Sequence, residues 1–491
     1  MDSINDRGLL DGTTDVFAFC ADQPAPLSES VKLPIPGQGK FFDEHIDLRD
    51  PEGGLLTERL VEIFDKVRPR KRKRGRDALR LRLRRLAANA LSAYFFRDIP
   101  AILYFRGAAV KDYTDKPDWM KHGAIGNVVD ALIAAGLADG ITGEKMPWNS
   151  KNPSTASSYW VTDELIRLAV ECDVTSQSIN QNVPADDLVQ LFAPKMRAGF
   201  DPLKRELIHP RKGKRIRFEA TVETNGWTTA LAAINAFYRQ HEITLGLAPD
   251  EIKDWLDKRN TYSEFRSPYR LPEMFATHIY RVFNNGVENN PTFDLGGRLF
   301  GGWWMYLSED LRRVITIDDK PTVELDYAHC HPRMLYHQRG LDGDGELYTL
   351  PEVTAYEIAT GVAASTYRPS IKWLVQILLN GRGRPGAVER PEWLKFPPDI
   401  PFNQMVQYVE AHHHLIADDF RTGAGLRLMR LESDIALEIV STAMAEGWPV
   451  LPVHDSFITT TDKRDRLKSL MIDTYVQRLG KEPVIKEPLT E

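Results

Sequence analysis

The sequence predicts an α+β fold, and three stretches of the chain indicate it. Two short β-type runs within residues 314–325, separated by a turn, lead to Asp326. A third apolar run, 449–453, leads to Asp455. Between the two aspartates, residues 368–381 are mostly apolar with polar side chains at every fourth position, which is typical of a helix.

The two aspartates occupy unusual positions. A carboxylate at the end of a buried strand is costly unless positive charge meets it, and a divalent cation is a common reason to keep it there. If the two strands converge, Asp326 and Asp455 can share a pair of metal ions. Phosphoryl transfer needs that arrangement, because one ion activates the attacking oxygen and the other stabilises the leaving phosphate.

The composition is that of a soluble protein with room for about two to four domains. Of its 491 residues, 42% are hydrophobic and 27% are charged, and the net charge is −6. Positive charge is nevertheless concentrated, with twelve Lys or Arg in residues 66–85 and a second basic stretch from Lys204 to Arg217. These stretches suit binding to phosphate groups, although a solvated charged helix or tail explains them equally well.

The cysteines and the apolar runs indicate the compartment. Cys20, Cys172 and Cys330 have neither metal-ligand spacing nor the density of a disulfide framework, which favours a reducing environment. The first residues lack the pattern of a secretory signal, and no apolar run reaches membrane-spanning length. We therefore expect a cytoplasmic protein with no membrane partner.

Changes in composition along the chain predict five regions. Residues 1–65, rich in Pro, Gly and Asp, read as an extended and partly disordered arm. The following regions are a basic helix with the segment after it (66–175), a basic linker (176–215), a helical region (216–300) and the region that carries both aspartates (301–491).

The second of these regions resembles a winged helix. Its basic helix carries three leucines on one face and is followed by a strand candidate at 102–105 and a helical pattern at 122–137. A polar loop then leads to an aromatic strand candidate near 157–162. In winged helices one helix enters the DNA major groove while a β-hairpin touches the backbone. The basic helix favours this interpretation, and a small helical packing domain remains the alternative.

The helix predicted between the aspartates has a polar stripe. Arg368, Lys372, Gln376 and Asn380 lie four residues apart and therefore share one face. Cations and amides in this order suit a triphosphate and its base. Alone, such a stripe is also typical of a solvent-exposed face, but its place between the two aspartates favours a binding site.

Three motifs in this part of the chain resemble those of the family A DNA polymerases and the single-subunit, phage-type RNA polymerases. They occur in the family's order, and the resemblance covers about residues 295–470. The Ser-Phe pair after the last motif is closer to the RNA polymerase form. The residues that carry the resemblance are Asp326, Tyr327 and Arg333 for motif A, Arg368, Lys372 and Gly381 for motif B, and His454 and Asp455 for motif C.

The resemblance implies a polymerase-like palm with a reduced helical fingers region, and it makes the helical residues 216–300 thumb-like. It implies that Asp326 and Asp455 are catalytic and hold two Mg²⁺ ions, or Mn²⁺, and that Lys372 protonates the leaving pyrophosphate. His454 would lie at the primer end. The implied nucleotide-binding residues are Arg368, Lys372, Gln376, Asn380, Tyr327, His331 and Arg333.

Three positions depart from the family's pattern. Asn380 stands where tyrosine is usual, and Gln376 stands where an aromatic residue or methionine is usual. His331 stands where the DNA enzymes use glutamate to exclude ribose. A histidine is bulky enough to exclude a 2′-hydroxyl, which favours deoxynucleotides. The reduced fingers leave priming, short fill-in and untemplated addition open beside templated copying.

The sequence therefore predicts a nucleotidyltransferase that extends a nucleic-acid 3′ end, with DNA polymerase favoured over RNA polymerase. Its partners would be DNA and nucleoside triphosphates. The alternative is a non-catalytic DNA-binding replication initiator or regulator with a degenerate polymerase-like domain.

Two smaller interpretations concern residues near the motifs. The three histidines at 412–414 are expected on an exposed helix turn rather than in a metal site. Glu432 and Asp434 precede the second catalytic strand. They are expected to form a salt-bridging helix face, with a third metal ligand as the alternative.

Overall fold

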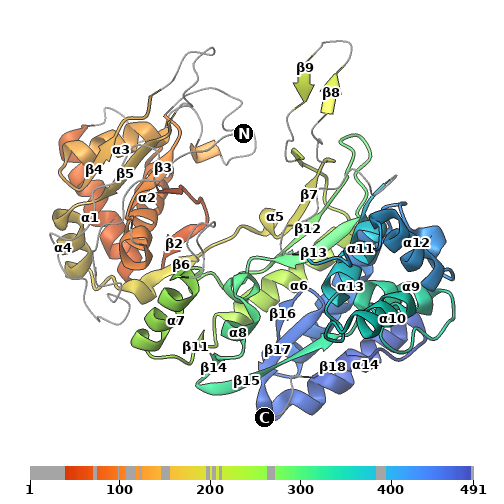
Figure 1. Ribbon diagram of the computed structural model, residues 1–491. Helices are drawn as coiled ribbons and strands as arrows, with labels where there is room; N and C mark the ends of the chain where they lie inside the picture. The colour runs from red at the N-terminus through yellow and green to blue at the C-terminus, as the bar shows by residue number, and fades with distance from the viewer. Residues whose placement is uncertain are drawn as a thin grey trace. The chain divides into compact units, whose positions relative to one another are not determined.

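The chain divides into two compact units in a computed structural model (Figure 1). Unit 1 comprises Met1–Pro184 and Leu247–Ala276, and unit 2 comprises Ala185–Gly246 and Thr277–Glu491. The residues that the structure describes are 39–69, 75–97, 99–106, 118–120, 124–144, 155–194, 199–201, 206–208, 213–261, 271–382 and 394–487. Every candidate catalytic residue lies in unit 2.

Unit 1 is built around a helix packed on a small sheet. The sheet has the order β1-β3-β5-β4, and β5 pairs antiparallel with both β3 and β4. The bounds of the sheet strands are Lys40–Phe41 (β1), Ile102–Tyr104 (β3), Ala138–Ile141 (β4) and Ser157–Val161 (β5). Two further strands pair with each other, Ile46–Leu48 (β2) and Ile179–Gln181 (β6). The helices are Glu52–Val67 (α1), Arg76–Phe96 (α2), Ala124–Ala134 (α3), Asp163–Glu171 (α4) and Pro249–Thr261 (α7).

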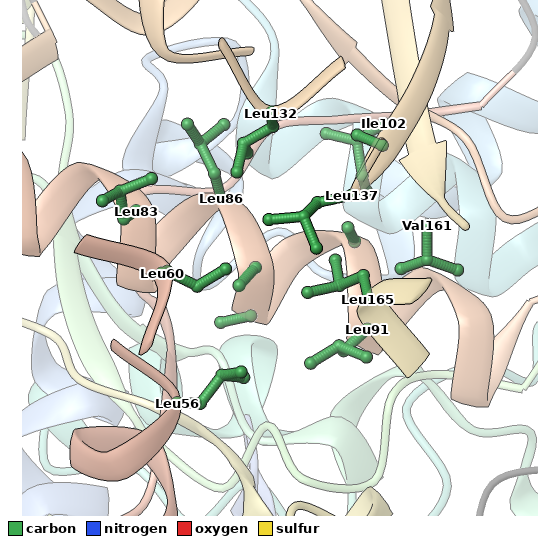
Figure 2. Close-up of a cluster of buried hydrophobic side chains, with 14 of the residues drawn as sticks. Leu56, Leu60, Leu83, Leu86, Leu91, Ile102, Leu132, Leu137, Val161 and Leu165 are labelled. Atoms are coloured by element: carbon green, nitrogen blue, oxygen red, sulfur yellow. The ribbon is translucent and has the colours of Figure 1, made fainter. Parts of the chain in front are cut away.

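The core of unit 1 forms around α2, because apolar residues three and four apart fall on its inner side. Leu83, Leu86 and Leu91 are fully buried there, and Leu132 of α3 and Leu165 of α4 pack into the same cluster (Figure 2). The helix and the leucine face predicted from the sequence are therefore confirmed.

Four of the five arginines of α2 are used inside unit 1. Arg84 Nε lies 2.6 Å from Asp47 Oδ1, and Arg80 lies 2.6 Å from Glu58 Oε2. The guanidinium groups of Arg82 and Arg85 donate to backbone carbonyls, of Trp119 and of His45 and Ile46 respectively. These four side chains hold the elements around α2, so they do not form the open basic surface that the sequence suggested. The basic residues 70–74 lie outside the described part of the chain.

Two regions contain more regular structure than the sequence predicts. Of the expected arm, residues 1–38 lie outside the described part, whereas 40–67 hold β1, β2 and α1. The expected linker 176–215 holds β6, Ala185–Leu188 (α5), Val189–Phe192 (β7) and Arg215–Ile216 (β10), with the β8–β9 ribbon at Gly199–Asp201 and Glu206–Ile208. Strands of two to four residues carry too few positions to show a period, and pairing within the fold stabilises them.

The central sheet of unit 2 has six strands and carries both aspartates. Its path is β11-β14-β15-β17-β16, and β18 also pairs with β15. A two-residue turn at Asp318 and Asp319, both at positive φ, joins β14 to β15. The bounds are Ile243–Leu245 (β11), Ile315–Ile317 (β14), Lys320–Tyr327 (β15), Leu451–Val453 (β16), Ser456–Thr460 (β17) and Ile485–Lys486 (β18).

A second sheet and several helices complete unit 2. The sheet has the order β10-β7-β12-β13, with β12 at Tyr280–Phe283 and β13 at Gly296–Phe300. Residues 216–300, which the sequence predicts to be helical, therefore also contain the strands β11, β12 and β13. The helices of unit 2 are Val222–Tyr238 (α6), Glu309–Arg312 (α8), Cys330–Gln338 (α9), Pro351–Thr360 (α10), Arg368–Asn380 (α11), Phe402–His412 (α12), Ala424–Ala445 (α13) and Arg464–Leu479 (α14). Within the described residues, no helix is both long and apolar enough to cross a membrane.

Candidate active site

The pairing of β15 with β17 brings the two aspartates together. The strands are antiparallel neighbours, and Asp326 lies directly opposite Ser456. Asp455 immediately precedes Ser456 in the two-residue turn that joins β16 to β17. The backbone N–H of Tyr327 donates to the carbonyl oxygen of Asp455 at 3.2 Å. The convergence that the sequence suggested is therefore present in the backbone itself.

The two carboxylates repel one another in a partly buried place. Burial, followed by the charge of Asp455, raises the pKa of Asp326. Burial, followed by the charge of Glu432, raises the pKa of Asp455. Within the described residues neither carboxylate has an ion pair, so an ionised pair at this site needs a cation to stabilise it.

The carboxylates fit a divalent cation that shares its ligands with a substrate. Among the described residues, no three His, Cys, Asp or Glu side chains are grouped so that they could enclose a metal. Two carboxylates nevertheless suit Mg²⁺, because that ion usually keeps several waters and binds one or two carboxylates together with substrate phosphates. The donor set of Asp326 and Asp455 is of this kind.

Helix α11 presents the polar stripe beside this pair. Ile371, Leu374 and Leu378 are buried on its inner side, whereas Lys372 is exposed. The positive charge of Lys372 acts to lower the pKa of Asp326, which places the lysine in the electrostatic field of the carboxylates. The predicted helix is confirmed, and its stripe borders the site.

Gln376 and Asn380 continue the stripe away from the cations. Asn380 Nδ2 donates to the Gln376 backbone carbonyl at 2.8 Å, so its amide is partly used within the helix. Gln376 Nε2 lies 3.5 Å from the hydroxyl of Tyr348. Both amides therefore remain on the helix surface, with only weak or local bonds.

Arg368 makes contacts with the loop between α9 and α10. Its guanidinium lies 3.1 Å from the Glu346 carboxylate and 3.2 Å from His329 Nε2. It also stacks over the ring of Tyr348, with 5.5 Å between the guanidinium carbon and the ring centroid. A substrate phosphate would have to replace Glu346 as the partner of this cation. No sequence pattern indicates a role for Glu346, because it lies in a loop outside the motifs.

Arg333 is turned away from the site and holds that same loop. The side chain is only 2% exposed. Its guanidinium donates to the backbone carbonyls of Ala328 at 3.0 Å and Gly345 at 3.2 Å, and also to that of Gly343. Its donors are thus used on the backbone, so it supports Glu346 rather than touching a nucleotide.

His331 is also engaged inside the protein. Its Nε2 lies 2.6 Å from Glu432 Oε2 of α13, and Arg298 of β13 binds the same oxygen at 2.7 Å. Burial would raise the pKa of Glu432, but the hydrogen bonds and charges of His331 and Arg298 lower it to about 2. Asp434, two residues later, pairs with Arg281 at 2.6 Å. The prediction of a salt-bridging helix face at Glu432 and Asp434 is confirmed.

Tyr327 lies in the core, whereas His454 lies in the turn beside Asp455. The Tyr327 hydroxyl donates to the Met471 carbonyl at 2.6 Å from within the core, so the structure does not bring this side chain to the site. Successive residues of a strand point to opposite faces, so Asp326, the neighbour of Tyr327, lies on the face that carries the site. His454 adopts a left-handed φ of 59° in the β16–β17 turn, next to Asp455.

The prediction of an exposed triple histidine is wrong for His413. This side chain has no exposed surface. Its Nε2 lies 3.0 Å from the Leu347 carbonyl and its Nδ1 lies 3.0 Å from the Tyr336 hydroxyl. Both ring nitrogens therefore have partners, which lets the protein bury a neutral imidazole.

No protein-family model matches the chain, and no curated protein matches it. Among solved structures, the chain is similar to the POL domain of Pol1 from M. smegmatis in complex with DNA primer-template and dNTP, at 13% sequence identity and a TM-score of 0.21. The similarity covers 44% of this chain and 48% of that chain, so it spans about half the length of that domain. A TM-score this low does not establish a common fold, and the function has to be argued from the site.

Proposed function

We propose that this chain is a metal-dependent nucleotidyltransferase that extends the 3′ end of a nucleic acid, with DNA synthesis favoured. The pairing of β15 with β17, which unites Asp326 and Asp455, is the observation that carries the proposal. A metal–triphosphate complex requires carboxylates to bind the metal ions and cations to bind the phosphates. The two aspartates would be the first, and Arg368 and Lys372 of α11 would be the second.

Asp326 and Asp455 would hold the cations. Bound there, Mg²⁺ or Mn²⁺ would favour ionisation of the attacking hydroxyl and neutralise charge on the phosphates. Glu432 is an unsuitable third ligand, because Arg298 and His331 already neutralise its carboxylate. The two aspartates have no such partners in the described structure, which supports them as the ligands.

The reaction can be written from the residues present. The 3′-hydroxyl oxygen forms a bond to the α-phosphorus of the nucleotide, and the bond from that phosphorus to the β-phosphate oxygen breaks. The hydroxyl proton passes to water, while Lys372 donates a proton to the departing pyrophosphate. Arg368 binds the triphosphate after releasing Glu346, and Gln376 and Asn380 lie farther along the helix, on the side of the base.

Unit 1 would bring DNA to this centre. Its order of α2, β3, α3, β4 and β5, with β5 between β3 and β4, resembles that of a winged helix, which supports this interpretation. The sequence of α3 contains no Lys or Arg, and four of the five arginines of α2 have partners within unit 1: Arg80, Arg82, Arg84 and Arg85. DNA binding by unit 1 is therefore proposed from topology and not from the basic face of α2.

The test is incorporation of labelled nucleotides onto a primer, with and without template, comparing dNTPs with NTPs in Mg²⁺ and in Mn²⁺. The wild type is compared with Asp326→Asn and Asp455→Asn, and Asp473→Asn on the exposed side of α14 is the matched control. Incorporation that only the two site variants abolish supports the proposal. A folded wild type that incorporates nothing under any of these conditions, while binding DNA, favours the non-catalytic alternative.

A further inference from the structure

A lysine from a distant part of the chain lies beside Asp326. Strand β18 pairs antiparallel with β15, and Lys486 is directly opposite Asp326 in the register. Residues directly opposite in an antiparallel pair project to the same face, with their Cβ atoms about 4.5–5.5 Å apart. The stem of Lys486 therefore starts next to the carboxylate of Asp326.

Lys486 and the second aspartate flank Asp326 from opposite sides. Strand β17, with Ser456 opposite Asp326, lies along one edge of β15, and β18 lies along the other. Lys486, Asp326 and Ser456 therefore lie in one row across the sheet, and Asp455 immediately precedes Ser456 in the chain. A positive side chain of the central sheet thus borders the two aspartates, on a different element from the cations of α11.

The strand that carries this lysine is fixed on both sides of it. The N–H of Ala328 donates to the Val484 carbonyl at 2.8 Å, which anchors the entry to β18. On the far side, Glu487 binds Lys468 Nζ at 2.7 Å and also pairs with Arg464, both from α14. Backbone bonds and ion pairs together therefore determine where the side chain at position 486 begins.

The ammonium group itself has no fixed partner. Lys486 is exposed, and among the described residues it makes no hydrogen bond or ion pair. A lysine on a short edge strand can also simply guard against sheet association, so the test has to separate the two roles.

We propose that Lys486 binds a phosphate group of the incoming nucleoside triphosphate, as a third cation beside Lys372 and Arg368. This inference rests on the proposed function, because it assumes that a metal-bound triphosphate occupies Asp326 and Asp455. An ammonium that borders the proposed metal site and has no partner among the described residues is available to an anion held at those carboxylates. The lysine stem lets the group move with the substrate rather than fixing it in one geometry.

The experiment measures equilibrium binding of Mg²⁺–dATP to the full-length protein, by calorimetric titration, without a primer. Lys486→Met keeps the length of the side chain and removes its charge, and Lys486→Arg restores a cation. Lys320→Met is the matched control, because Lys320 is exposed at the other end of β15, about 20 Å away along the strand. Thermal unfolding of each variant verifies that the fold is intact.

Lys486→Met should weaken binding about tenfold, which is the effect of one charged hydrogen bond to phosphate. Lys486→Arg should stay close to the wild type, and Lys320→Met should not change the affinity. An unchanged affinity for Mg²⁺–dATP in Lys486→Met would overturn the inference. If the wild type extends primers and Lys486→Met binds dATP normally, only this inference fails. If Lys486→Met weakens binding and the wild type extends nothing, the proposed function fails instead.

Discussion

Glu346 binds Arg368, the first residue of α11, at 3.1 Å, and the same carboxylate lies 2.7 Å from His329 Nε2. The acid comes from the loop between α9 and α10, whereas the arginine belongs to the polar stripe of α11. In the absence of substrate, the charge of Arg368 is thus already balanced by a protein carboxylate.

Replacing this acid should strengthen nucleotide binding. Glu346→Gln removes the negative charge that competes with phosphate for Arg368, so the nucleotide KM should fall about threefold to tenfold. The measurement is KM for dNTP in primer extension, with Asp344→Asn in the same loop as the control. A rise in KM would mean instead that Glu346 positions Arg368 for the substrate.

The carboxylates of Asp326 and Asp455 should lower the stability of the metal-free protein. Asp326→Asn removes the repulsion with Asp455, so the free energy of unfolding should increase by about 1–2 kcal/mol while incorporation is lost. Urea denaturation in the presence of EDTA measures the change. The surface variant Asp473→Asn should stay within about 0.5 kcal/mol of the wild type, and a destabilised Asp326→Asn would contradict the expected repulsion.

Arg333 should matter through the loop that it holds. Arg333→Met leaves the carbonyls of Ala328, Gly343 and Gly345 without their donor, at a cost of about 2–3 kcal/mol. Hydrogen exchange of residues 341–350 should become faster and the nucleotide KM should rise. If exchange in this loop stays unchanged while KM rises, Arg333 contacts the nucleotide directly and its loop-holding role is not the important one.

His413 should make stability depend on pH. Burial, then the charge of His412, lowers the pKa of His413 to about 4, whereas an unfolded histidine titrates near 6.5. Between these pH values the unfolded chain binds the proton and the folded chain does not, so the stability that neutral His413 contributes is lost as pH falls. We expect a loss of about 2 kcal/mol between pH 7 and pH 5.

Chemical denaturation across this pH range tests the effect. His413→Gln should be less stable at pH 7 but should show a weaker pH dependence. His414→Asn, at an exposed position, is the matched control and should keep the wild-type slope. Identical slopes in all three proteins would show that other groups control the acid response.

The sequence predicted those parts of the site that local pattern determines. The apolar runs before Asp326 and Asp455 are long enough to indicate strands, and the spacing of Arg368 and Lys372 indicates a helix face. Lys486 gave no such signal, because a two-residue strand has no period and only its pairing with β15 makes it relevant.

Side-chain partners were the other part that the sequence left open. Basic composition does not reveal that Arg84 of α2 is paired with Asp47, since the two are brought together by packing. The same applies to His413, which is polar by type and buried because Tyr336 and a backbone carbonyl satisfy its ring. Such partners depend on contacts between distant segments, which no local pattern contains.

The register between β15 and β17 also affects how the protein folds. Helices α9 to α13 lie between the two strands in sequence, so a long loop must close before Asp326 meets Asp455. Helices form from local contacts and precede such distant strand pairing. Intermediates can therefore contain an ordered α11 before Asp326 and Asp455 have come together. A divalent ion that binds the completed pair would stabilise the native state selectively, and refolding in its presence would report closure of the sheet.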